Sequence, residues 1–151
     1  GGITNKTIVN SGGVELVNSG IANGTIISGG LEHVAAGGAA ADVTFQGGGS
    51  TLQLDRSDLL SGQISGFGDT DVIDLRDIAF GSGTTLIDVA DPISKSSTLT
   101  LSDGSNMASL LLLGQYSAAN FVLSSDGHGG TLITEHATAA PTSLAPNGLA
   151  A

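Results

Sequence analysis

The residues whose types and spacing best suit metal chemistry are four aspartates in the middle of the chain, Asp69, Asp71, Asp74 and Asp77. Gly66 and Gly68 lie just before them. Calcium takes several oxygen ligands from carboxylates and backbone carbonyls on flexible turns, so the cluster predicts a calcium site. The alternative is that these acids cap turns and remain in contact with solvent.

Two details of the same segment bear on that choice. The calcium-binding β-roll repeat, Gly-Gly-x-Gly-x-Asp, requires Asp at position 70 when it is aligned on Gly66 and Gly68, and the chain has Thr70 there. In a strand over residues 71–75, Asp71 and Asp74 would face opposite sides of the sheet. The calcium prediction therefore depends on turns rather than on one strand face.

The chain lacks the motifs of the common enzyme classes. No serine has the Gly-x-Ser-x-Gly spacing of a nucleophile elbow, and no His-Glu-x-x-His occurs. Paired carboxylates could cleave glycosides, but there is no Trp and only one Tyr to stack on a sugar. His128 lies in a glycine-rich turn, where a hydrogen-bonding role is more common than a catalytic one. We predict no catalytic residues and a non-enzymatic protein.

Charge and composition exclude several partners. Fourteen acids against four bases give a formal net charge of −10, which disfavours nucleic acids and anionic membrane surfaces and permits cation binding. The absence of Cys excludes disulfides and cysteine-based zinc sites. No apolar run approaches transmembrane length.

The elements that would position any site come from a repeat in the first third of the chain. The segment at residues 7–17 (Thr-Ile-Val-Asn-Ser-Gly-Gly-Val-Glu-Leu-Val) is repeated at residues 25–34 (Thr-Ile-Ile-Ser-Gly-Gly-Leu-Glu-His-Val). A weaker copy covers residues 43–49. The copies are 17 or 18 residues apart. Repeats of about 20 residues are typical of solenoids, in which each unit covers the apolar face of its neighbour.

The local sequence predicts β-structure throughout the repeats. Glycines that occur singly (Gly20), in pairs or in a triplet every 8 to 10 residues mark tight turns, and β-branched residues between them favour strands. We therefore predict an all-β, right-handed parallel β-helix over residues 1–55, with two strands and two turns in each repeat. In-register stacking would place Ile8 over Ile26 and Val17 over Val34.

Residues 56–136 lose the regular glycine pairs and are predicted to be a β-rich module that continues or caps the stack. Residues 99–101 and 107–113, joined through Asp103-Gly104, are predicted to form a hairpin. Residues 115–120 could form a short helical turn. Four of the five aromatic residues lie in this module and could close the apolar end of the stack, namely Phe67, Phe80, Tyr116 and Phe121. Residues 137–151, rich in Ala, Pro, Thr and Ser, are predicted to be a flexible tail.

The repeat over residues 27–40 (Ile-Ser-Gly-Gly-Leu-Glu-His-Val-Ala-Ala-Gly-Gly-Ala-Ala) resembles the strand-loop-strand repeat of AIDA-type autotransporter adhesins. Residues 65–75 and 112–132 resemble the C-terminal module of large repeat-rich proteobacterial proteins similar to type I secretion substrates. The resemblance implies an extracellular β-solenoid for adhesion or matrix building, with exposed Ser and Thr as glycan acceptors.

Three hypotheses of function remain open. The first is a structural module of a secreted bacterial surface adhesin or extracellular matrix protein that binds glycans or proteins on cell surfaces. The second is a filament subunit that joins copies of itself end to end through residues 1–10. The third is a calcium-dependent folding and secretion module. The chain begins inside a repeat, so the first coil is expected either to continue a longer array or to be an assembly surface.

Overall fold

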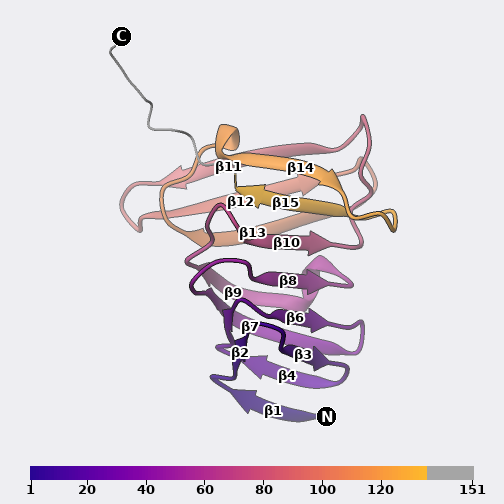
Figure 1. Ribbon diagram of the computed structural model, residues 1–151. Helices are drawn as coiled ribbons and strands as arrows, with labels where there is room; N and C mark the ends of the chain where they lie inside the picture. The colour runs from indigo at the N-terminus through magenta and orange to yellow at the C-terminus, as the bar shows by residue number, and fades with distance from the viewer. Residues whose placement is uncertain (136–151) are drawn as a thin grey trace.

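The computed structural model describes residues 1–135, and the predicted tail lies outside this range. The described residues form an all-β structure in which stacked parallel strands build a β-solenoid (Figure 1). The strands are β1 (Gly2–Asn5), β2 (Ile8–Asn10), β3 (Val14–Val17), β4 (Gly20–Asn23), β5 (Ile26–Ser28), β6 (Leu31–Val34), β7 (Gly38–Phe45), β8 (Thr51–Leu54), β9 (Leu60–Ser65), β10 (Val72–Leu75), β11 (Thr85–Asp91), β12 (Ser96–Ser102), β13 (Met107–Leu113), β14 (Phe121–Ser125) and β15 (Thr131–Glu135). Two 3-10 turns, η1 (Ser57–Leu59) and η2 (Ala118–Asn120), complete the set.

The solenoid has four coils, which confirms the predicted stacked β-fold. Coil 1 contains β1, β2 and β3, and coil 2 contains β4, β5 and β6. Coil 3 contains β7 and β8, and coil 4 contains β9 and β10. One wall is the parallel ladder β1-β4-β7-β9, and the opposite wall is the parallel ladder β3-β6-β8-β10. Equivalent residues of successive repeats therefore lie one above another.

The predicted register is confirmed. Ile8 pairs with Ile26, and Val17 pairs with Val34. Gly2, Gly20 and Gly38 form one column across three coils. The number of residues between paired positions increases later in the solenoid. Val43, for example, pairs with Ile64, 21 residues further along the chain.

The prediction of two strands per repeat is wrong for the first two coils, which have three strands each. Lys6 adopts a φ of 55°, in the left-handed region, and this bend separates β1 from β2. In coil 3 the corresponding segment is the single strand β7, with a bulge at Asp42, where φ is 57°. The Asp42 carboxylate accepts a hydrogen bond from the backbone N–H of Gln63 at 2.9 Å, which ties the bulge to the next coil.

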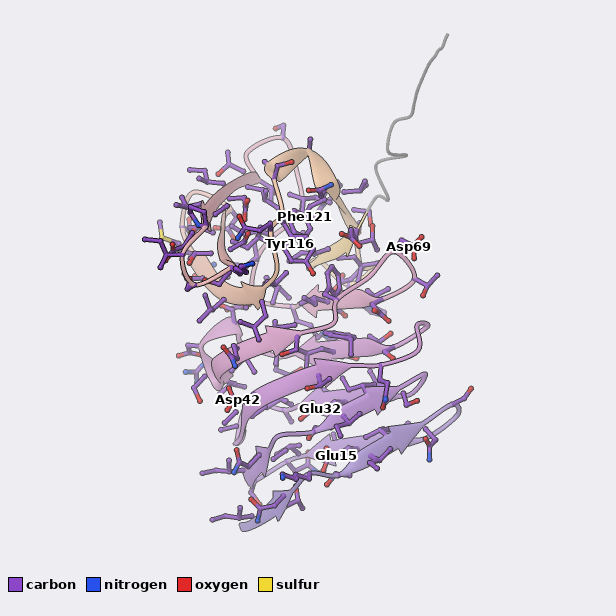
Figure 2. The ribbon with its side chains drawn as sticks, turned by 90° about the vertical axis from the view of Figure 1, so that its left-hand side faces the viewer. Glu15, Glu32, Asp42, Asp69, Tyr116 and Phe121 are labelled. Atoms are coloured by element: carbon purple, nitrogen blue, oxygen red, sulfur yellow. The ribbon has the colours of Figure 1, made fainter. Side chains whose placement is uncertain are left out.

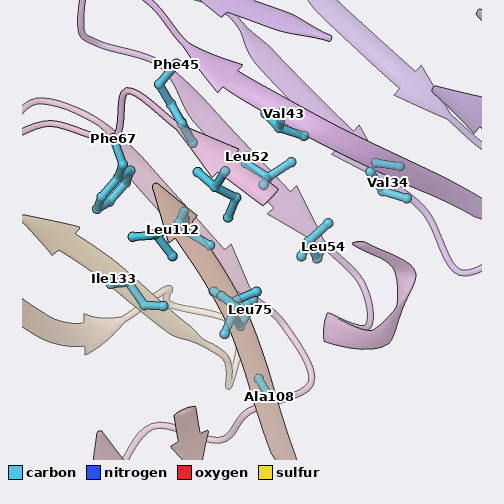
Figure 3. Close-up of a cluster of buried hydrophobic side chains, with 14 of the residues drawn as sticks. Val34, Val43, Phe45, Leu52, Leu54, Phe67, Leu75, Ala108, Leu112 and Ile133 are labelled. Atoms are coloured by element: carbon cyan, nitrogen blue, oxygen red, sulfur yellow. The ribbon is translucent and has the colours of Figure 1, made fainter. Parts of the chain in front are cut away.

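Aliphatic columns fill the interior of the solenoid (Figure 3). One column contains Val17, Val34, Leu54 and Leu75, and the last three are fully buried. Burying a side chain of this size contributes about 1.5–3 kcal/mol. The interior thus explains why a chain with 3% aromatic residues can fold.

Antiparallel strands close one end of the stack (Figure 1). The β11-β12-β13 meander joins coil 4 through β13 and β9, and β15 and β14 join it through β10. The predicted hairpin is confirmed as β12 and β13, and η2 lies within the segment predicted to form a helical turn. Parallel stacking extends through β10, so residues 60–75 continue the solenoid and residues 85–135 cap it.

Aromatic residues pack under this cap, as predicted for three of the four. Phe67 lies 5.2 Å from Phe45 and 6.4 Å from Phe121, measured between ring centroids. Tyr116 lies 5.3 Å from Phe121, and its hydroxyl donates a hydrogen bond to the carbonyl of Phe67 at 2.9 Å. Phe80 is 44% exposed and lies in the segment between β10 and β11, whereas the nearby Ile78 is buried in the core. The prediction for Phe80 is therefore wrong.

Candidate functional site at the open end of the solenoid

The end of the solenoid opposite the cap presents unpaired strand edges. Among the described residues, β1, β2 and β3 each pair with only one neighbouring strand, on coil 2. Their other edges carry backbone N–H and C=O groups that can pair with an added strand. We call this surface the open end.

Aliphatic side chains surround the open end on the outside of coils 1 and 2. Each of these side chains has a relative exposure between 43% and 67%, and the residues are Ile3, Ile8, Val14, Leu16 and Ile21. In coil 3 the residues that continue these columns are smaller or polar. Ile21 pairs with Ala39. Ile26, which pairs with Ile8, also pairs with Thr44 on its other side. Exposed apolar residues that gather in one region mark an interaction surface. The outer surface of coils 1 and 2 is therefore apolar at these positions.

A hollow of about 180 Å³ opens at this end. Its lining comes from β1, β3 and the chain leading into β4, and includes Thr4, Glu15 and Val17. These three side chains belong to the inward-facing positions of coil 1, because the residues above Thr4 and Val17, Ala22 and Val34, are buried in the core. The hollow is therefore the uncovered end of the solenoid interior.

Two glutamates stack in this interior, and the sequence analysis did not single them out. Glu15 on β3 pairs with Glu32 on β6, one coil further into the structure (Figure 2). The Glu15 carboxylate accepts hydrogen bonds from the hydroxyls of Thr25, at 2.8 Å, and Thr4, at 3.2 Å. Glu32 has a relative exposure of 0%, and neither of its carboxylate oxygens has a hydrogen-bond partner.

This environment raises the pKa of Glu32 from its ordinary value of 4.5 to about 7. Burial is the main cause, and the charge of Glu15 adds to it. The nearby Thr25 hydroxyl lowers the pKa in part, although its proton is donated to Glu15. Because its pKa is about 7, Glu32 can gain or lose a proton near neutral pH.

The four predicted calcium ligands do not converge. Asp71 is buried and caps a turn, where its carboxylate accepts hydrogen bonds from the N–H groups of Ser50 and Gly68. Asp77 accepts from the N–H and hydroxyl of Ser57, both at 2.9 Å. Asp69 is exposed in the turn before β10 (Figure 2). Over residues 1–135, no group of three or more His, Asp or Glu side chains is arranged to hold a metal ion.

Asp74, the fourth predicted calcium ligand, faces outward from β10. It lies next to Asp126, which belongs to the glycine-rich turn that also contains His128. Asp126 Oδ1 accepts hydrogen bonds from the N–H groups of His128 and Gly130. Burial and the nearby Asp126 raise the pKa of Asp74 to about 7. Asp74 on coil 4 and Asp126 in the cap therefore form a second pair of neighbouring carboxyl groups.

His33 was not among the predicted site residues. It lies on the outside of β6 and is partly buried against Asp55, with Nε2 2.9 Å from Oδ1. The pair joins two coils.

Within the part of the chain that the structure covers, no helix is long and apolar enough to cross a membrane. The chain matches no protein-family model, no curated protein and no solved structure.

Proposed function

We propose that this chain is a structural module of a secreted bacterial surface adhesin or extracellular matrix protein, in which the solenoid is a stiff support for adhesion. The observation that carries the proposal is the in-register stack of parallel coils. Each coil is held by its neighbours along two continuous ladders, which gives a rod-like geometry suited to presenting a surface. The resemblance of the repeats to AIDA-type adhesins supports the same class.

The partner surfaces in this proposal are glycans or proteins outside the cell. The apolar residues around the open end supply contact area, and neighbouring Asn side chains supply hydrogen bonds. Asn5 and Asn23 form such a polar pair, in which Asn23 Nδ2 donates to Asn5 Oδ1 at 3.1 Å. The net charge of −10 disfavours nucleic acids as partners.

An adhesion assay tests this function. Beads coated with the folded chain are expected to be retained on epithelial cells or on a glycan-coated surface several times more than beads coated with the heat-denatured chain. Soluble folded chain should compete for the same receptors and reduce retention. Equal retention of both bead types would refute the adhesive role.

The exposed aliphatic residues of coils 1 and 2 favour a second candidate, a self-assembling filament subunit. Unpaired edges flanked by exposed aliphatic residues are typical of strand-addition surfaces. Light scattering is expected to show a mass that rises with concentration, and Ile8→Lys on β2 should abolish the rise. Met107→Lys is the control, because Met107 is also exposed, at 70%, but lies on cap strand β13, which pairs with strands on both sides. A strict monomer at all concentrations would exclude this candidate.

A further inference from the structure

The Glu15–Glu32 pair leaves negative charge inside the protein without a protein counter-charge. Neither residue takes part in an ion pair within residues 1–135, where the recorded pairs are His33–Asp55 and Arg56–Asp58. Glu32 is fully enclosed, and both of its oxygens lack a donor. A buried carboxylate with no partner is costly, so the site requires a proton or a cation.

The surroundings of the pair resemble a ligand shell for a hard cation. Glu15 and Glu32 face the same interior from adjacent parallel strands, which lie about 4.8 Å apart. Together they offer four carboxylate oxygens. The hydroxyls of Thr4 and Thr25 hydrogen bond to Glu15 and hold its carboxylate in place. The hollow of about 180 Å³ borders Glu15, whereas Glu32 lies one coil further in and does not line it.

We propose that Glu15 and Glu32 form a binding site for one calcium ion at the open end of the solenoid. One divalent ion would neutralise both carboxylates. Calcium accepts six to eight oxygen ligands in irregular geometry, so two carboxylates and water from the hollow can satisfy it, whereas magnesium demands a near-ideal octahedron. Zinc is disfavoured because the pair offers neither nitrogen nor sulfur.

This site differs from the one predicted at Asp69, Asp71, Asp74 and Asp77, and it also lies apart from the Asp74–Asp126 pair. The proposal holds whether the solenoid serves adhesion or assembly, because it depends only on the interior of coils 1 and 2. Binding there would tie the two coils together at the end where strand pairing is incomplete. Calcium would thereby stabilise the surface at which the solenoid can meet a partner.

The test is calorimetric, on chain first freed of metal with EDTA. At about pH 8, with Glu32 ionised, about 1 mM calcium chloride is expected to raise Tm by at least ~5 °C. Isothermal titration should give a stoichiometry near one. At about pH 5 the rise should shrink, because protons compete for Glu32.

Amino-acid substitutions show which residues the calcium-induced rise in Tm depends on. Glu15→Gln and Glu32→Gln keep the size of the side chain and should each abolish the calcium-induced rise in Tm. Asp69→Asn, at an exposed position near the opposite end, and Asp74→Asn should retain it. An unchanged Tm in the wild-type chain would overturn the proposal, and so would an equal rise in Glu32→Gln or a loss confined to Asp74→Asn.

Discussion

Replacing Gly38 with alanine is expected to lower the free energy of unfolding by about 3 kcal/mol, which corresponds to a decrease in Tm of roughly 10 °C. A Cβ atom at this position, at the start of β7, would lie 2.1 Å from the carbonyl oxygen of Val17, the last residue of β3. The obstructing atom belongs to the backbone, so the start of β7 and the end of β3 would have to move apart. Gly38 does not have a positive φ, and the loss therefore measures coil-to-coil contact rather than backbone strain.

Gly2 supplies the matched control, because it occupies the same column of the ladder on coil 1. A Cβ atom on Gly2 would meet nothing within 4 Å. Gly2→Ala should therefore change the free energy of unfolding by no more than about 0.5 kcal/mol. Chemical denaturation of both variants provides the comparison. Equal losses in the two variants would mean that Gly38 does not lie against a lower coil.

Replacing Glu32 with glutamine is expected to stabilise the metal-free protein by roughly 3 kcal/mol at about pH 8. The pKa of Glu32 is about 7 in the folded state and 4.5 ordinarily, so the folded protein holds this proton more tightly than the unfolded chain. The stability that the proton provides is fully present below about pH 4.5. It is lost as the pH rises through about 7. Glutamine stays neutral and removes this dependence.

Denaturant titrations from about pH 4 to pH 9, in EDTA, measure this effect. The difference between wild type and Glu32→Gln isolates Glu32 from Asp74, whose raised pKa contributes in the same direction in both proteins. The difference should increase with pH and level off above about pH 8. A constant difference across the range would show that Glu32 does not carry an unfavourable charge in the interior.

The sequence predicted the stacking but not the course of each coil. The spacing of the glycine pairs was enough to place Ile8 beside Ile26, because in-register stacking follows directly from a regular repeat. Lys6, Gly24 and Asp42 occupy equivalent positions in coils 1 to 3, and all three have a left-handed φ. The strand is interrupted at the first two and only bulged at Asp42, a difference that the residue types do not predict. The longer steps of coils 3 and 4 arise where the repeat has become unrecognisable.

The candidate sites were harder to predict, because side-chain direction decides them. Asp71 and Asp77 were grouped by proximity in the sequence, yet each caps a different turn. Glu32 was overlooked because glutamate is ordinarily exposed. The available signal was its position two residues before Val34, which puts both side chains on the same face of one strand. The repetition of that pattern at Glu15 and Val17 could have identified the interior pair.

Distances between spin labels test the stacked, in-register coils most directly. The chain has no cysteine, so labels can be attached only at introduced sites. Ile8→Cys/Ile26→Cys places two labels on paired residues, about 5 Å apart at the backbone. Strong dipolar broadening of the electron paramagnetic resonance spectrum is expected, and weaker broadening for Ile8→Cys/Thr44→Cys, two coils and about 10 Å apart. A spectrum for the first pair equal to the sum of its single-label spectra would contradict the solenoid.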